Sequence, residues 1–171
     1  MAGNAAIVRI ATPDDAEQLI ALVHANEGEL NLTNEPGEFN MSVEEERAFL
    51  ANFEHQATSE FFIAEVDGQV VGSLGMRGNK RRATQHVVSI GIAVHPQFRG
   101  QGIGSALLQR GLEWAKETGT VRRMELTVYA RNEGAIRLYQ RFGFVEEGCH
   151  RNTFCKSGEY IDSLTMAMLI E

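Results

Sequence analysis

The stretch VHPQFRGQGIGSALL, from Val94 to Leu108, places three glycines beside Arg99, between an apolar strand pattern and an apolar helix pattern. Closely spaced glycines let the main chain approach a ligand, and the free amides and dipole at a helix N-terminus attract anions. The residue types and their spacing therefore predict a phosphate-binding turn. A glycine-rich turn that serves only tight strand-to-helix packing is the alternative.

Two widespread phosphate loops do not fit this stretch. The Walker loop needs Gly-Lys-Ser or Gly-Lys-Thr, and no lysine stands here. The dinucleotide fingerprint needs G-x-G-x-x-G, whereas Gly100, Gly102 and Gly104 give G-x-G-x-G. What remains is a proline-containing turn, then Arg-Gly-x-Gly-x-Gly and a helix, whose successive amides can point at a pyrophosphate.

The segment VSIGIAVHPQFRGQGIGSALL resembles the acetyl-CoA-binding motif of the GNAT family (GCN5-related N-acetyltransferases), Gln/Arg-x-x-Gly-x-Gly/Ala, with Arg99, Gly102 and Gly104 in the fixed places. A second block, NEGAIRLYQRFGF from Asn132 to Phe144, is similar to the family's Asn-x-x-Ala-x-x-Leu-Tyr-x-x-x-Gly-Phe pattern. The C-terminal part resembles bacterial amino-acid N-acyltransferases and the related polyamine and ribosomal-protein acetyltransferases. The likeness is close over residues 86–144 and looser elsewhere.

The resemblance implies acetyl-CoA as the cofactor. Main-chain amides from Arg99 through Ser105 would hold the pyrophosphate. The pantetheine arm would lie along the preceding strand like an extra strand near a bulge, for which Gly91 is suited, although a strand glycine often marks only a bend. The implied cofactor-binding residues are Ile92, Ala93, Val94, Arg99, Gly100, Gln101, Gly102, Ile103, Gly104, Ser105, Asn132, Ala135 and Tyr139.

Acetyl transfer to an amine needs a neutral nucleophile, a polarised thioester carbonyl, close positioning, and a proton for the departing thiolate. The resemblance implies that Tyr139 donates this proton as a general acid. From the residues alone, Tyr139 is predicted to be a core aromatic, because it shares one helical face with Ala135, Ile136 and Phe142. Asn132 is a good helix N-cap, and the family places its side chain at the pantetheine arm.

The general base is less well marked. Relatives often carry Glu or His on the central strand, and alternation places His86, Val88, Ile90 and Ile92 on one face, where the inner positions are apolar. His86 at the strand end would act only through water. Glu125 on the next strand is a second candidate, and a water chain without a dedicated base is a third.

The acceptor pocket is expected between the first two helices, their loop and the last strands. That loop carries Glu27, Glu29, Glu35 and Glu38, which could receive a cationic amine or form only a solvated acidic surface. A small primary amine, above all a free amino acid, is the predicted acceptor. A polyamine, a protein N-terminus, or a coenzyme A-binding sensor that does not turn over are the alternatives.

Composition and charge bear on the number of domains, the partners and the location of the protein. The 171 residues fit one domain, residues 1–171, and the net charge of −7 argues against nucleic-acid binding. Cys149 and Cys155 lack a metal-ligand spacing, so we expect two reduced thiols and no metal. Neither a signal peptide nor a membrane span is expected, which favours a cytoplasmic protein. Homodimerisation is compatible with the family but not established by the sequence.

The elements that must position these residues follow from helix caps and turns. Thr12-Pro13, the Ser42/Glu45 capping box and Asn132 mark helix starts, and Asp67-Gly68 marks a hairpin. The resulting order is βααβββαβαββ. We therefore expect an α/β (α+β) fold of the GNAT type, with a central mixed, mostly antiparallel sheet of about seven strands and about four helices.

Overall fold

A computed structural model describes residues 6–27, 35, 37–53 and 56–171. These parts of the chain form seven strands and four α-helices in the predicted order. Their bounds are β1 Ile7–Ile10, α1 Ala16–Ala25, α2 Val43–Ala51, β2 Glu60–Val66, β3 Gln69–Gly78, β4 Val87–Val94, α3 Ile103–Glu117, β5 Arg123–Tyr129, α4 Glu133–Arg141, β6 Val145–Lys156 and β7 Glu159–Leu169.

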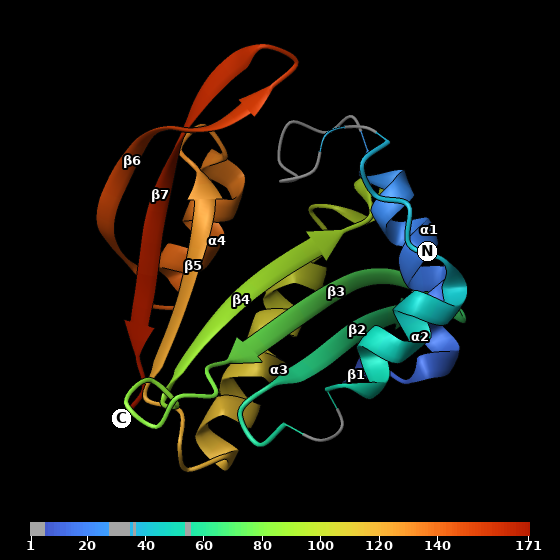
Figure 1. The fold of residues 1–171 in the computed structure, drawn as a ribbon, viewed down its shortest axis with the longest axis horizontal. Coiled ribbons are helices and arrows are strands. Elements are labelled where there is room, and N and C mark those ends of the chain that lie inside the picture. Colours follow the sequence, from blue (N-terminus) through green and yellow to red (C-terminus); the bar gives the residue numbers. More distant parts are fainter. Residues whose placement is uncertain (1–5, 28–34, 36, 54–55) are drawn as a thin grey trace.

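The strands form one sheet in the order β1-β2-β3-β4-β5-β7-β6. The pairing of β4 with β5 is parallel and the five other described pairings are antiparallel, which confirms the mixed, mostly antiparallel sheet. In Figure 1 the sheet divides into two halves that meet only near one end of β4 and β5. β1 to β4 form one half, and β5, β7 and β6 form the other.

Helices cover both faces of the first half of the sheet. A cluster of buried side chains joins α1 and α2 to one face and includes Leu19, Leu22, Leu50 and Ile63. The larger cluster lies on the other face, where α3 and α4 cover the sheet; it includes Leu107, Leu108, Met124 and Met166. In Figure 1, α3 and α4 accordingly lie on the opposite side of the strands from α1 and α2.

The predicted caps and turns position these helices and strands. Ser42 and Glu45 form the capping box of α2, with Glu45 N donating to Ser42 Oγ over 3.2 Å and Ser42 N to Glu45 Oε2 over 2.8 Å. Asp67 and Gly68 have φ values of 51° and 80°, as the two-residue β2–β3 hairpin requires. One expectation needs correction: after Thr12 the chain makes a short 3₁₀ turn, and α1 begins only at Ala16.

β4 and β5 separate soon after they pair. Their ladder has three residue pairs, the last of which joins Ser89 to Glu125. β4 then follows β3 up to Val94, and β5 follows β7 up to Tyr129. The bulge expected near Gly91 is absent, because the β3–β4 register runs without a shift and pairs Gly91 with Gly75. The separation arises where the ladder stops, not at an extra residue.

Candidate active site

A cavity of about 1200 Å³ occupies the opening between β4 and β5. Its walls come from β3, β4, β5, the turn before α3, the N-terminal part of α3, and α4, together with Val23 and Asn26 at the end of α1. Phe154 of β6 contributes to the wall beside β5 and packs edge-on against Tyr129, with ring centroids 4.8 Å apart. The cavity thus joins the predicted cofactor and acceptor regions.

The glycine turn presents unpaired amides to this cavity. Gly100 and Gly102 have φ values of 73° and 84°, and a Cβ at either position would meet no atom within 4 Å. Gly102 is the N-cap of α3 and provides no side-chain cap. Within the described chain, no backbone hydrogen bond is donated from Gly100 through Ser105, whereas Ala106 N already donates to Gly102 O. These amides and the α3 N-terminus fit a pyrophosphate.

Gly104 has a different role from the other two glycines. It lies inside α3, and a Cβ there would stand 3.1 Å from Cδ2 of Leu138 on α4. The missing side chain therefore lets α4 approach the first turn of α3. Gly104 thus fits the packing interpretation of the glycine stretch, while Gly100 and Gly102 line the cavity, as the phosphate-binding interpretation requires.

The exposed edge of β4 fits the arm of the same ligand. Beyond Ser89 the β4 edge that faces β5 has no strand partner in the described sheet, and Ile92, Ala93 and Val94 line the cavity there. An extended chain with amide groups can add to such an edge as a further strand. The free edge and the free turn amides are contiguous, so one elongated ligand can use both.

Tyr139 faces the cavity from α4. Its residue surface is 7% exposed, and burial raises the pKa of its hydroxyl to about 12. Its ring lies 5.7 Å from that of Phe144. The phenol is therefore both a core side chain and a cavity-lining group, and it keeps its proton throughout the neutral range.

Of the thirteen predicted cofactor residues, twelve line the cavity and Gln101 does not. The Gln101 side chain turns back, donating from Nε2 to the carbonyl oxygen of Gln97 over 3.1 Å. Asn132 caps α4 as predicted, since its Oδ1 accepts from Ala135 N over 3.1 Å. That bond leaves the amide group of Asn132 at the cavity wall.

The candidate bases lie at or beyond the edge of the site. His86 is exposed, precedes β4, and does not line the cavity. The face that it was expected to share is the core face, since Val88 and Ile90 pack into the cluster with α3. Ser89 and Gly91 alternate with these core residues, so the β4 positions that face the α1–α2 side carry no acid or imidazole.

Glu125 lies next to the cavity without lining it. Its carboxylate pairs with Arg123 Nε at 2.9 Å and accepts from Ser89 Oγ at 3.5 Å, where β4 and β5 diverge. Ser89 itself lines the cavity. Any effect of Glu125 on the site therefore passes through Ser89 or water.

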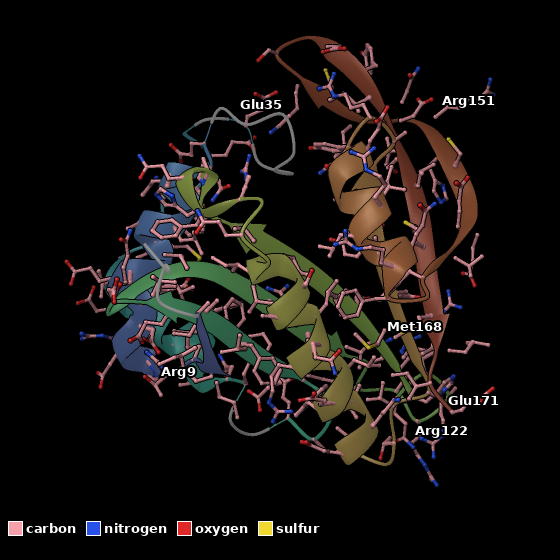
Figure 2. All side chains as sticks on the ribbon, turned by 180° about the vertical axis from the view of Figure 1, so that it is seen from behind. Arg9, Glu35, Arg122, Arg151, Met168 and Glu171 are labelled. Atoms are coloured by element: carbon pink, nitrogen blue, oxygen red, sulfur yellow. The ribbon has the colours of Figure 1, made fainter. Side chains whose placement is uncertain are left out.

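The predicted acidic acceptor residues do not gather in the cavity. Glu27 pairs with His24 over 3.0 Å, and Glu35 Oε1 accepts from the backbone amide of Ser157 at the β6–β7 turn over 2.7 Å. Figure 2 shows Glu35 between the α1 end of the molecule and that hairpin. Glu29 lies outside the described residues. Neither Glu27 nor Glu35 lines the cavity, so their positions do not fit direct contact with an amine there.

Cations line the cavity instead, and two of them were not predicted from the sequence. The charged residues among its described lining are Arg77, Arg99 and Arg141. Arg141 ends α4 and reaches Ser105 Oγ with its Nη2 at 3.5 Å, beside the α3 N-terminus. Arg141 stands two residues after Tyr139, a spacing that turns it to another face of a helix, so no signal in the sequence marked it. Arg77 had none either, because a strand-end arginine is ordinary on a surface.

Three further observations concern metal binding, the two cysteines and membrane-spanning helices. The described residues contain no cluster of three or more side chains suited to a metal ion. Cys149 and Cys155 are both exposed and unpaired with each other. In the part of the chain that the structure covers, no helix combines the length and apolarity needed to cross a membrane.

Comparison with known proteins agrees with this geometry. Residues 28–144 match the model of the acetyltransferase (GNAT) family. The L-amino acid N-acetyltransferase AaaT of Escherichia coli (strain K12) is 36% identical over 105 residues, which cover 61% of this chain and 65% of that protein. The chain thus spans slightly less than two thirds of that relative's length.

Solved structures extend the likeness over nearly the whole chain. An acetyltransferase of the GNAT family from Streptococcus pneumoniae is 28% identical, with a TM-score of 0.92 over 98% of this chain and 100% of that chain. A phosphinothricin acetyltransferase from Sinorhizobium meliloti, in complex with acetyl-CoA, shares the fold at 22% identity and a TM-score of 0.86, over 96% and 88% of the two chains. The protein belongs to the acetyltransferase (GNAT) family.

Proposed function

We propose that this chain transfers the acetyl group of acetyl-CoA to the amino group of a free amino acid. The observation that carries the proposal is the continuous cavity from the unpaired amides at Gly100–Ser105, along the free edge of β4, to Tyr139. Family membership and the acetyl-CoA complex of the Sinorhizobium meliloti relative support the same ligand.

The cofactor would be held at two places. Amides of the turn and the first turn of α3 would bind the diphosphate, with the Arg141 guanidinium adding positive charge beside Ser105. Backbone groups of Ile92, Ala93 and Val94 would pair with the pantetheine arm. Acetyl-CoA supplies the activated acetyl group, and the same β4 amides would polarise its carbonyl.

Tyr139 would donate a proton to the departing sulfur of coenzyme A. Because its pKa is about 12, its hydroxyl remains a hydrogen-bond donor at every physiological pH. A thiol ordinarily has a pKa near 8.5, so a phenol this weak would protonate a thiolate only reluctantly in water. The burial that raises the pKa of Tyr139 also destabilises a thiolate beside it, and this reduces the mismatch. Tyr139 would thus deliver its proton to the sulfur as the new amide forms, and the proton that the attacking nitrogen releases in the same step would restore the phenol.

The acceptor amine must lose its proton before attack. No acid or imidazole lines the described cavity, so a water chain leading out past Ser89 would carry that proton. Ser89 lies at the base of the opening and would relay the proton to the Glu125 carboxylate behind it, which would accept it. This arrangement makes Glu125 an indirect acceptor of the proton.

A free amino acid is the preferred acceptor on two grounds. The first is the partial match to a relative named for L-amino acid acetylation. The second is the absence of carboxylates from the described lining, which disfavours a multiply charged polyamine.

Release of free thiol from acetyl-CoA tests the proposal. The purified protein is offered the free L-amino acids, spermidine, and a short peptide with a free N-terminal amine, and acetyl-CoA binding is measured in parallel by calorimetry. Turnover that depends on a free amino acid supports the proposal. Tight acetyl-CoA binding with no turnover on any amine would contradict it and favour a coenzyme A-binding sensor.

A further inference from the structure

The charge of the cavity is divided between its two ends. Arg99 and Arg141 belong to the turn and to α4, beside the α3 N-terminus where the diphosphate would bind. Arg77 lies on β3, on the strand face that carries Ser73 and Gly75 into the cavity. One cation therefore lies among the acceptor-side residues, away from the phosphate turn.

The side chain of Arg77 is exposed, and its guanidinium lies over an aromatic ring. Its guanidinium carbon lies 5.2 Å from the ring centroid of Phe49 on α2, and Phe49 packs edge-on against Phe53 and Phe61. Arg77 forms no ion pair with any residue that the structure describes. A stacked guanidinium keeps its edge available for a planar anion such as a carboxylate.

Glu46 is an acid whose carboxyl group interacts electrostatically with the Arg77 guanidinium. It lies on α2 and is 6% exposed; burial raises the pKa of its carboxyl, and the charge of Arg77 acts in the opposite direction. Glu46 does not line the cavity. It therefore lowers the positive potential at Arg77 without forming part of the cavity wall.

The strand register places Arg77 in a row with two polar partners. Arg77 pairs with Ser89 across β3 and β4, and Ser89 pairs with Glu125 across β4 and β5. Adjacent strands lie about 4.8 Å apart, so the row spans about 10 Å between the Arg77 and Glu125 backbones. A cation, a hydroxyl and a carboxylate thus follow one another at the base of the opening. Of this row, Arg77 and Ser89 line the cavity, so a zwitterion there would place its carboxylate toward Arg77 on β3 and its amine toward Ser89 on β4.

We propose that Arg77 binds the α-carboxylate of the amino-acid acceptor and so determines that the acceptor carries one. This inference rests on the proposed acetyl transfer and adds the group by which the acceptor is recognised. A bidentate guanidinium–carboxylate contact fixes the orientation of the substrate as well as its charge. Polyamines, amino-acid amides and simple alkylamines lack that contact.

The test compares an acid with its amide. For the L-amino acid turned over fastest, kcat and KM are measured for the free acid and for its carboxamide, in the wild type and in Arg77→Gln, Arg77→Lys and Arg47→Gln. Arg47 is an exposed arginine of α2 that does not line the cavity and serves as the matched charge control. Thermal unfolding and acetyl-CoA titration verify that each variant folds and binds the cofactor.

We expect Arg77→Gln to raise KM for the free acid by about 10- to 100-fold, as for a lost hydrogen bond to a charged group, and to leave the amide unchanged. Arg77→Lys should recover only part of the loss, and Arg47→Gln should have no effect. Equal losses for acid and amide, or no loss for either, would overturn the role of Arg77 while leaving acetyl transfer intact. No turnover with any amine would instead overturn the proposed function, and this inference with it.

Discussion

Arg99 donates from Nη2 to Oδ1 of Asn26 over 2.6 Å, which joins the turn before α3 to the C-terminal end of α1. The Asn26 amide group donates in turn to Leu22 O over 2.8 Å, and Arg99 Nε donates to Val94 O over 3.2 Å. Asn26 is 2% exposed while Arg99 is exposed, so this link joins a buried amide to the surface of the turn. The arginine of the cofactor motif therefore also fixes the helix that leads into the acceptor loop.

The Asn26–Arg99 link predicts coupled effects on stability. Asn26→Ala leaves the Leu22 carbonyl and the Arg99 guanidinium without this partner, and we expect a loss of about 1–2 kcal/mol in the free energy of unfolding. Once Asn26 is removed, Arg99→Ala should cost less than it does in the wild type. A double-mutant cycle by urea unfolding should give a coupling of about 1 kcal/mol, whereas strict additivity would contradict the link.

Substitution of Tyr139 separates catalysis from binding. Tyr139→Phe removes the hydroxyl and keeps the ring that packs against Phe144. Loss of a proton donor typically lowers turnover by about 10²- to 10⁴-fold, and we expect a fall in kcat in that range. The Kd for acetyl-CoA, measured by calorimetry, should change by less than about threefold. An unchanged kcat would remove Tyr139 from the chemistry.

A carboxylate at Gly102 tests the phosphate turn. Gly102→Glu places negative charge at the α3 N-terminus, where the diphosphate would bind, and should weaken acetyl-CoA binding by more than about 100-fold. Because Gly102 has a φ of 84°, any side chain also strains the backbone. Gly102→Ala carries the same strain without the charge and is the control. Normal affinity in Gly102→Glu would show that the diphosphate binds elsewhere.

Burial of Tyr139 predicts a pH dependence of stability. Its pKa is about 12 in the folded protein and near 10 when unfolded, so the native state keeps a proton that the unfolded state loses as pH rises. The contribution is fully present below pH 10 and is lost as pH rises toward 12, by about 2–3 kcal/mol. Urea unfolding of the wild type should decline more steeply over this window than that of Tyr139→Phe. If the free energy of unfolding fell equally with pH in both proteins, the pKa of Tyr139 would not be raised in the folded state.

The part of the candidate site that would bind the cofactor could be predicted from the sequence, because the features that mark it depend on residues close together in the chain. Glycine conformations, the Asn132 cap and the helix N-terminus depend on neighbouring residues, and both motifs lie at fixed spacing. The order of helices and strands along the chain followed from caps and turns for the same reason. Gly91 was misjudged because a free strand edge and a bulge look alike in sequence.

The part of the candidate site that would bind the acceptor was harder to predict, because it depends on how neighbouring strands are aligned and on which face of β4 the helices cover. Alternation along β4 shows which residues share a face, but only the packing of α3 shows that Val88 and Ile90 occupy the core side. The acids of the α1–α2 loop suggested a negative pocket, yet Glu35 bonds to the β6–β7 turn. The row of Arg77, Ser89 and Glu125 joins three strands, and no spacing along the chain reveals it.

A crystal structure of the protein with acetyl-CoA would show directly whether the opening between β4 and β5 binds the cofactor. We expect the diphosphate on the amides from Gly100 to Ser105, the pantetheine arm along Ile92–Val94, and the sulfur within hydrogen-bonding reach of the Tyr139 hydroxyl. A cofactor bound outside the opening between β4 and β5, or a sulfur directed away from Tyr139, would contradict this expectation.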